Sequence, residues 1–540
     1  MPMSLRPAAV LAPAALCAAL ILLGACTERQ PLPVDPTERL FGRGLDEIAD
    51  LYIEPVSSRI LALAAAARLS ELDAKFAVLE TPGPGDHTEI ALDYGGRELA
   101  TYANPSGDDP HLWGAWLGQV IENAKAASPT LAATSEDKID EALFDGMTGA
   151  LDRFSRYSSP AAARDQRAAR DGFGGVGLTL DPSPDRFRII KILPGGPADL
   201  AGIRPGDTVV SIDGRPTAGL SQSEVVRQLR GPVLSPVSLG IERPGTQSLG
   251  AADTRDYQLQ RVLIVEPTVT ASRADGIAIF HISSFNQDTT QQLVADLDAV
   301  RREMGPQLRG IVLDLRGDPG GLLDQAVSLA DVFIAKGPIV ATVGRNPASR
   351  QFFEASGDSV APLLPIVVLV NGGSASASEI VAAALQDAGR AVVVGTASYG
   401  KGTVQTVLRL PNNGELILTW ARLVAPSGYL LNGRGVVPTV CTSDLGNDEL
   451  SVGIALQRAT GAAALSPLTA RPRKSLDDRQ WDALRASCPP RLAERPIDLA
   501  VAERLLDDPA LYSQATHLIT ETPSLAARPV GTAPASDPPS

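Results

Sequence analysis

The sequence has little histidine, little cysteine and no clustered basic charge. Its 540 residues include four histidines and four cysteines, and 48 Lys and Arg are outnumbered by 62 Asp and Glu, giving a net charge of −14. No run rich in Lys and Arg is interleaved with aromatic residues, which argues against a nucleic-acid partner. No histidine stands in a Gly-rich loop of the later, α/β-like part of the chain, so a Ser-His-Asp triad has little support.

The N-terminal segment reads as an export signal rather than as part of the fold. An apolar run from Ala8 to Leu23 is too short and too close to the terminus for a comfortable membrane span. It ends in Leu-Gly-Ala-Cys26, an arrangement that resembles the bacterial lipobox, in which the cysteine becomes the lipidated first residue of the exported protein. An ordinary signal peptide with an incidental cysteine is the alternative.

The expected location follows from that reading. We expect a lipoprotein signal peptide over residues 1–25, a polar, Pro-rich tether over 26–40, and a protein held by lipid on the periplasmic side of a bacterial membrane. Thr27 stands where an aspartate often retains lipoproteins at the inner membrane, so the outer membrane is favoured. Cys441 and Cys488 are then left for the exported protein, and an oxidising compartment favours a disulfide between them over two free thiols.

The pattern along the chain predicts a multidomain α/β protein. Residues 41–165 read as a helical region with an inserted hairpin, 170–250 as short strands with one capped helix, and 263–441 as alternating strands and helices. That alternation predicts a layered α/β domain with parallel strands. Residues 442–521 read as partly helical, and 522–540 as a disordered tail.

Two glycine-rich stretches match nucleotide-binding motifs but stand in the wrong context. The GxGxxG match at 172–177 follows a charged stretch and precedes β-like residues, whereas the dinucleotide fingerprint joins a strand to a helix. The GxxxxGK match at 395–401 is followed by Gly402, where Mg²⁺ binding requires Ser or Thr, and then by a strand-like stretch. No metal or cofactor is implied.

A candidate nucleophile lies between a predicted strand and a predicted helix. Ser376 stands in the sequence NGGSASASE, which joins the strand ending at Val370 to the helix that begins near Ala377. Such a tight turn exposes a side chain and leaves the first N–H groups of the helix free to stabilise an anion. Ser376 is therefore a candidate nucleophile with the Ala377 N–H as an oxyanion donor, and a plain helix cap is the alternative.

Lys401 is the candidate base, because it lies in the Gly-rich loop after the next predicted strand. Neighbouring parallel strands bring their C-terminal loops together, so Lys401 can approach Ser376. A lysine acts as a base only when neutral, so its reference pKa of about 10.4 must fall by several units through burial. Gln405 is placed to orient the amine, and a surface lysine in a turn is the alternative reading.

Linked motifs over about residues 140–440 resemble those of the C-terminal processing peptidases, also called tail-specific proteases. They are GSASASEI (373–380), YGKGTVQ (399–405), DLRGDPGG (314–321), LTWARLVAPSG (418–428), GVVPTV (435–440) and LDRFSRY (151–157). The resemblance implies a crotonase/Clp-like serine peptidase core with Ser376 as nucleophile, Lys401 as base and Gln405 as its partner. A second oxyanion donor would come from Gly320 or Gly321. Asp318, where the family usually has Asn, and Thr439, where it commonly has Asp, depart from the pattern.

Residues 172–245 resemble a PDZ domain, which captures a C-terminal carboxylate on backbone N–H groups and adds the peptide as a strand. The resemblance implies that the loop from Gly174 through Gly175 and Val176 to Gly177 supplies the amides. The helix over 221–230 would supply the opposite wall through Val225 and Leu229. A PDZ fold kept only as a rigid spacer is the alternative.

Together with these resemblances, the sequence predicts a serine endopeptidase that cleaves proteins near their C-termini through a Ser-Lys dyad. Its PDZ domain would recognise the free C-terminus of substrates that end in apolar residues. The main alternative is a catalytically inactive, PDZ-bearing lipoprotein that binds peptides or serves as a scaffold; a hydrolase of non-protein esters is a weaker one. Whether an adaptor lipoprotein delivers substrates is left open. Residues 76–135 and 442–520 match no motif that assigns them a role.

Overall fold

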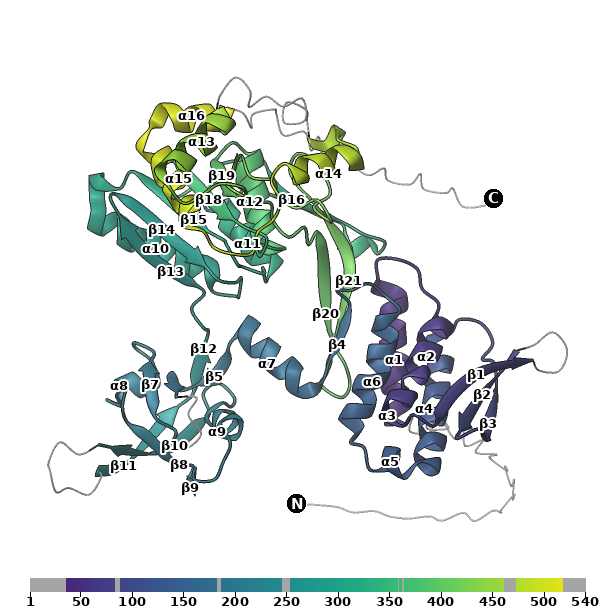
Figure 1. The fold of residues 1–540 in the computed structure, drawn as a ribbon. Helices are drawn as coiled ribbons and strands as arrows, with labels where there is room; N and C mark the ends of the chain where they lie inside the picture. The colour runs from purple at the N-terminus through teal and green to yellow at the C-terminus, as the bar shows by residue number, and fades with distance from the viewer. Residues whose placement is uncertain are drawn as a thin grey trace, which may run out of the picture.

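The computed structural model describes residues 35–82, 88–181, 186–244, 253–357, 359–361, 364–460 and 473–517. Cys26, the predicted signal peptide and the predicted disordered tail lie outside these residues. Figure 1 shows three bodies, an N-terminal helical domain, a smaller β-rich domain and a larger α/β core, with a helix and a long hairpin between them. No helix of the described part of the chain is both long and apolar enough to cross a membrane.

The N-terminal domain packs helices against a small antiparallel sheet. Its elements are α1 (Pro36–Leu51), α2 (Ser58–Ala67), α3 (Leu69–Leu72), β1 (Phe76–Pro82), β2 (Thr88–Tyr94), β3 (Glu98–Ala103), α4 (Pro110–Ala127), α5 (Pro129–Ala132) and α6 (Glu136–Gly149). The Asp35 carboxylate caps α1 by accepting the N–H groups of Thr37 and Glu38, so this helix begins inside the predicted tether. The predicted hairpin is present as β2 and β3, and β1 adds a third strand.

A long hairpin ties the N-terminal domain to the core. The five-stranded sheet that carries it contains β4 (Arg156–Ser158), β16 (Pro338–Val343), β17 (Gln351–Glu354), β20 (Thr403–Arg409) and β21 (Glu415–Val424). Leu410, Leu416 and Leu418, at and near the hairpin tip, are buried in the hydrophobic core of the N-terminal domain. The strand that directly follows Lys401 is therefore held at its far end by another domain (Figure 1).

The β-rich domain follows helix α7 (Pro160–Asp171) and has its own hydrophobic core. Its elements are β5 (Phe173–Gly175), β6 (Leu178–Leu180), β7 (Ile189–Ile192), α8 (Pro197–Leu200), β8 (Thr208–Ile212), β9 (Arg215–Pro216), α9 (Gln222–Leu229), β10 (Pro236–Arg243), β11 (Asp253–Gln260) and β12 (Val262–Ile264). The predicted capping box begins α9, because Ser221 N–H donates to Glu224 and Glu224 N–H to the Ser221 hydroxyl. Strand β11 pairs with β10, so this domain extends beyond the predicted boundary at 250.

The core is built on a six-stranded sheet in the order β13-β14-β15-β18-β19-β22. Its strands are β13 (Val269–Ala274), β14 (Ile277–Ile282), β15 (Gly310–Asp314), β18 (Ile366–Val370), β19 (Ala391–Gly395) and β22 (Val440–Cys441). Only the β13–β14 pair is antiparallel, and the other four pairs are parallel. Strands β18 and β19 contain only apolar residues and glycine because both faces of the sheet are covered.

Helices cover the two faces of this sheet in layers. On one face lie α10 (Thr289–Met304), α11 (Leu323–Asp331) and α12 (Ala377–Asp387), packed against residues such as Ile366 and Val368. On the other face lie α13 (Glu449–Thr460), α15 (Pro496–Asp507) and α16 (Pro509–His517), packed against the alternate residues Val367 and Leu369. Helix α14 (Asp478–Ala486) and the short 3-10 turns η1 (Gly305–Gln307), η2 (Pro347–Ser349) and η3 (Arg473–Ser475) complete the chain. The α/β layering predicted from the sequence is confirmed.

Candidate active site

Ser376 lies at the N-terminal end of α12, directly after the loop that follows β18. Its backbone has φ of 56° and ψ of −111°, a conformation that a non-glycine residue rarely adopts. The residue is partly exposed. The strained turn presents this side chain beside the free N–H groups of the helix end, where negative charge is stabilised.

The two neighbouring serines have structural roles instead. Ser374 and Ser378 are fully buried. The Ser374 hydroxyl donates to the Leu315 carbonyl at 2.8 Å, and the Ser378 hydroxyl donates to the Asp318 carbonyl at 3.0 Å. Of the three serines in this stretch, Ser376 is the one that is partly exposed.

Glu379 connects the serine turn with the lysine loop. Its carboxylate is fully buried, and one oxygen, Oε2, accepts the N–H groups of both Ser376 (2.8 Å) and Lys401 (2.9 Å). The other oxygen accepts the Ser398 hydroxyl (2.5 Å) and the Gly400 N–H (2.7 Å). Because a single side chain holds both backbones, the residues after β18 and after β19 are fixed relative to each other. Sequence reasoning missed this role, although the three-residue spacing from Ser376 to Glu379 is that of a capping box.

Lys401 lies in a partly buried position at the root of β20. Burial lowers the pKa of its amine, and the nearby Arg156 lowers the pKa further, against the opposing charges of Glu379 and Asp152. Its Nζ lies 5.6 Å from the centre of the Phe154 ring. A depressed lysine pKa increases the neutral fraction, which is the form that accepts a proton.

Gln405 lies on β20 at a bulge in its pairing with β21. Its amide nitrogen donates to the hydroxyls of Thr403 (2.9 Å) and Thr419 (3.3 Å). Among the hydrogen bonds of the described residues, none joins Gln405 to Lys401. Because the two threonines accept hydrogen bonds from the amide nitrogen, the carbonyl oxygen of the Gln405 side chain remains available to accept a hydrogen bond from another group.

The loop after β15 packs directly on the serine turn. A Cβ built on Gly320 would lie 2.6 Å from the Ala375 carbonyl oxygen and 2.9 Å from Ser376 Cβ, so only glycine fits there. The Gly320 N–H donates to Asp318 Oδ1 at 2.8 Å and is therefore not free for an oxyanion. For the Gly321 N–H no acceptor is found in the described part of the chain. Of the two predicted donors, Gly321 is thus the available one.

Asp318 is a buried carboxyl group, and no ion pair to it is found among the described residues. Its side chain is fully buried, and Oδ2 has no hydrogen-bond partner among the described residues. Burial raises the pKa of Asp318 to about 7, against the hydrogen bond from the Gly320 N–H. Near neutral pH this group therefore changes charge close to Ser376.

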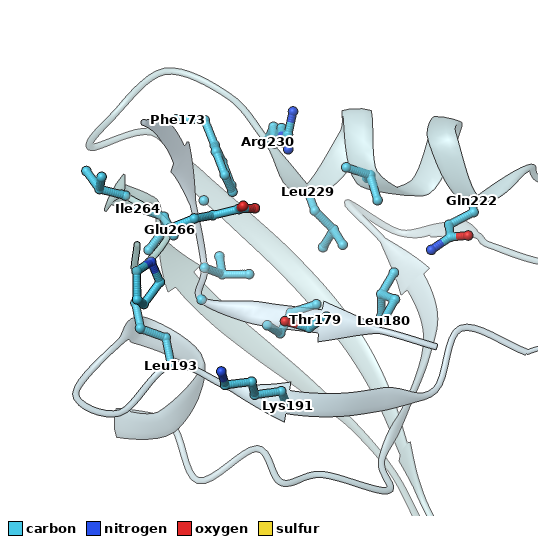
Figure 2. A pocket seen from close by; sticks show the side chains of 17 residues that line it. Phe173, Thr179, Leu180, Lys191, Leu193, Gln222, Leu229, Arg230, Ile264 and Glu266 are labelled. Atoms are coloured by element: carbon cyan, nitrogen blue, oxygen red, sulfur yellow. The ribbon is translucent and has the colours of Figure 1, made fainter. Parts of the chain in front are cut away.

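A cleft of about 270 Å³ in the β-rich domain lies between β6 and α9. Figure 2 shows Thr179 and Leu180 on the strand side, with Leu229 and Gln222 on the helix side. The cleft is lined by Gly175, Val176 and Gly177 from the predicted amide loop, and the linker residues Ile264 to Pro267 close one end. Such a cleft beside an exposed strand edge suits an extended peptide.

Two of the predicted peptide-binding residues do not line this cleft. Val225 is fully buried in the domain core because it lies on the inner face of α9, and its neighbour Val226 lines the cleft instead. Gly174 lies behind the loop, where its carbonyl accepts the Gly231 N–H at 3.0 Å. On α9, therefore, Val226 and Leu229 face the cleft, whereas Val225 faces the domain core.

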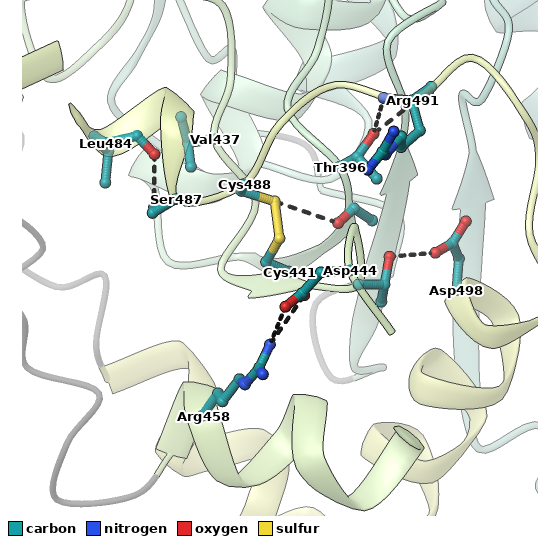
Figure 3. The surroundings of a disulfide bond; sticks show 12 residues. Thr396, Val437, Cys441, Asp444, Arg458, Leu484, Ser487, Cys488, Arg491 and Asp498 are labelled. Carbon is teal, nitrogen blue, oxygen red and sulfur yellow. Dashed lines mark hydrogen bonds and ion pairs between the residues drawn. A yellow bond between two sulfur atoms is a disulfide. The ribbon is translucent and has the colours of Figure 1, made fainter. Parts of the chain in front are cut away.

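Cys441 and Cys488 form a disulfide that joins the end of β22 to the segment after α14 (Figure 3). The two cysteines are 47 residues apart in the sequence. The chain between them follows the part, about residues 140–440, whose motifs resemble a known family. Among the described residues, no group of three or more His, Cys, Asp and Glu side chains is arranged to hold a metal ion.

Comparisons with known proteins agree with this architecture. Residues 276–442 match peptidase family S41, and residues 165–242 match the PDZ domain. The chain is 37% identical over 326 residues to a carboxy-terminal-processing protease of Bartonella bacilliformis, covering 60% of this chain and 74% of that one. It is 33% identical over 310 residues to a Staphylococcus aureus protein named "Probable CtpA-like serine protease", covering 57% of this chain and 60% of that relative's length.

Among solved structures, a photosystem II D1 C-terminal processing protease is 31% identical, with 56% of this chain and 80% of that chain covered and a TM-score of 0.32. The identity and coverage of the Bartonella relative confirm the family that the motifs predicted. The chain belongs to peptidase family S41 and is a serine protease of the carboxy-terminal-processing type with a PDZ domain.

Proposed function

We propose that this peptidase cleaves proteins near their C-termini, with Ser376 as nucleophile and Lys401 as general base. The observation that carries the proposal is the buried Glu379 oxygen that accepts the N–H groups of both residues. Two further observations support it: Ser376 is the partly exposed serine of its stretch, and burial lowers the pKa of Lys401.

In the proposed reaction the Ser376 hydroxyl attacks the scissile carbonyl carbon while the neutral Lys401 amine takes its proton. The N–H groups of Ala377 and Gly321 stabilise the oxyanion that forms. Lys401 then gives the proton to the leaving amine, and water releases the acyl group with Lys401 again accepting a proton. Gln405 would hold the amine through its carbonyl oxygen, since its amide nitrogen donates to two threonines.

We further propose that the PDZ cleft selects substrates by a free, apolar C-terminus. The backbone N–H groups of the 175–177 loop would receive the terminal carboxylate, and Leu180, Val226 and Leu229 would contact apolar side chains. The proposed setting is the periplasmic side of a membrane, through lipid on Cys26, with an adaptor lipoprotein as an open question. Mass spectrometry of the mature N-terminus tests the lipid, and an unmodified start would exclude it.

The decisive experiment incubates the purified protein with a substrate that ends in an apolar tail, free or amidated, and identifies the products by mass spectrometry. Ser376→Ala should abolish cleavage, and Lys401→Arg should do nearly the same because guanidinium stays protonated at any usable pH. The exposed Lys336→Arg is the matched control and should cleave at the wild-type rate. Amidation should weaken binding.

Two outcomes would contradict the proposal. Cleavage that survives Ser376→Ala but is lost in Ser374→Ala would mean that the nucleophile is misassigned. If the wild-type protein cleaves nothing yet binds the tailed substrate, the chain is an inactive binding module, the alternative that the Asp318 departure keeps open.

A further inference from the structure

The segment 485–492, which connects α14 to α15, lies beyond the part of the chain that matches peptidase family S41. It nevertheless runs between the serine turn and the lysine loop. Figure 3 shows Arg491 beside Thr396 and Cys488 beside the end of β22. Nothing in the proposed chemistry uses these residues, so their contacts need a separate explanation.

The segment holds the loop that carries the nucleophile. The Gly372 N–H donates to the Arg491 carbonyl at 2.7 Å, and the Asn371 side chain donates to the Leu492 carbonyl at 2.9 Å. Asn371 Oδ1 in turn accepts the N–H groups of Gly317 and Gly373, both at 2.9 Å. The serine turn and the oxyanion loop are thus both attached, through Asn371, to a backbone from the C-terminal region.

The same segment holds the loop that carries the base. The Ala397 N–H donates to the Cys488 carbonyl at 3.3 Å, and the Arg491 N–H donates to the Thr396 hydroxyl at 3.1 Å. The Arg485 guanidinium donates to the Ser398 carbonyl at 3.0 Å. Successive residues of the lysine loop are therefore bonded to one short stretch of chain.

Arg485 makes the most specific of these contacts. Its second amino group donates to the Arg434 carbonyl at 2.5 Å, so the guanidinium joins two loops. Its positive charge also interacts with the buried carboxylate of Glu379, the group that holds the backbones of Ser376 and Lys401. A partner cation lowers the cost of keeping that carboxylate ionised away from water.

The disulfide anchors the segment to the sheet. Cys441 pairs with Gly395 at the end of β19, the strand that leads into the lysine loop. Through the Cys441–Cys488 bond, the segment is therefore covalently attached next to the loop that it contacts.

We propose that residues 485–492 form a positioning element for the active site, with Arg485 as its main positioning residue and the Cys441–Cys488 disulfide as its anchor. This inference rests on the proposed roles of Ser376 and Lys401. The element touches loop backbones rather than substrate, so its loss lowers kcat and leaves KM nearly unchanged.

The kinetic test compares Arg485→Met with a matched control. Arg390 is also a partly buried arginine that donates to two carbonyls, Phe333 and Ala361, but it lies at the opposite end of β19. Arg485→Met should lower kcat at least tenfold with KM within twofold, whereas Arg390→Met should retain kcat. Arg485→Lys, which keeps the charge, should recover part of the loss. Equal losses of kcat in the Met variants at Arg485 and Arg390 would overturn the proposal.

A second measurement does not depend on cleavage. In the Ser376→Ala protein, adding Arg485→Met or Cys441→Ser should raise hydrogen–deuterium exchange in peptides covering 371–376 and 396–401. The reason is that a loosened segment 485–492 no longer holds the Arg491 and Cys488 carbonyls in place to accept the Gly372 and Ala397 amides. With Arg485→Met, exchange elsewhere in the core should stay unchanged, whereas Cys441→Ser should also raise it there because that variant lowers the free energy of unfolding. Unaltered exchange in both loops would overturn the positioning role even if the enzyme is active. If the wild-type protein cleaves no substrate, the proposed Ser376–Lys401 dyad is overturned. The exchange measurement still decides whether residues 485–492 position the two loops, because it does not require cleavage.

Discussion

Replacing Asp318 by asparagine tests whether a buried carboxyl group controls the pH range of this enzyme. The side chain is fully buried, its Oδ2 has no partner among the described residues, and burial raises its pKa to about 7 from 3.8. Asp318→Asn keeps the shape and the acceptor for the Gly320 N–H but carries no charge at any pH.

The magnitude follows from the two pKa values. Because the folded-state pKa is the higher one, the folded protein binds the proton more tightly, and stability falls as pH rises from 3.8 to about 7. At about 1.4 kcal/mol per unit, the cost of the ionised carboxylate is about 4 kcal/mol above pH 7 and about 2 kcal/mol at pH 5. Between pH 5 and pH 8, the free energy of unfolding of Asp318→Asn should therefore rise by about 2 to 3 kcal/mol relative to that of the wild type.

Urea denaturation of both proteins at pH 5 and pH 8 measures this gain in stability. Asp298→Asn, at an exposed position, is the control and should show no such gain. Activity gives a second readout, since an ionised carboxylate near Ser376 opposes a developing oxyanion. Both proteins keep Lys401, whose loss of a proton raises activity with pH, so the readout is the ratio of their kcat/KM values: that of Asp318→Asn relative to the wild type should rise as the pH increases through 7. If the difference in stability between Asp318→Asn and the wild type is the same at both pH values, the reasoning is refuted, because the pKa of Asp318 would then be the same in the folded and unfolded protein.

The remaining predictions concern a loop and a covalent bond. Gly320→Ala should lower kcat at least a hundredfold, because the new methyl group would lie 2.6 Å from the Ala375 carbonyl oxygen and displace the loop, and a steady-state assay checks this. Activity near the wild-type level would mean that the loop is not part of the site. Cys441→Ser should lower the free energy of unfolding by about 4 kcal/mol, the loop-entropy value for a closed loop of 47 residues. Urea denaturation measures it, and a wild type equally stable with and without reductant would contradict it.

The central strands of the core were predictable because they are buried on both faces. Residues 366–370 and 391–395 form apolar runs bounded by turn residues, and the structure places them side by side and parallel. That arrangement is what brings the serine turn and the lysine loop to one edge of the sheet. The rule that parallel neighbours align their C-terminal ends was therefore enough to relate Ser376 to Lys401.

Other elements were missed for identifiable reasons. Helix α7 buries only the small side chains Ala163 and Ala168, so no large apolar residue marks its inner face in an otherwise charged sequence. Helix α4, by contrast, lies inside the predicted helical region and carries a local signal, an Asp109 cap followed by Pro110 and apolar residues at helical spacing. The hydrogen bond from Gly320 to Asp318 depends on a loop glycine at φ of 97°, which no local pattern specifies.

The C-terminal helices leave one face of the core sheet uncovered until late in synthesis. That face is covered by α13, α15 and α16, all of which follow the strands of the sheet along the chain. Because a chain emerges from the ribosome N-terminus first, the sheet exposes apolar residues such as Val367 and Leu369 until these helices have been made. In that interval the exposed face can associate with other apolar surfaces, so the C-terminal helices protect the newly made core from aggregation.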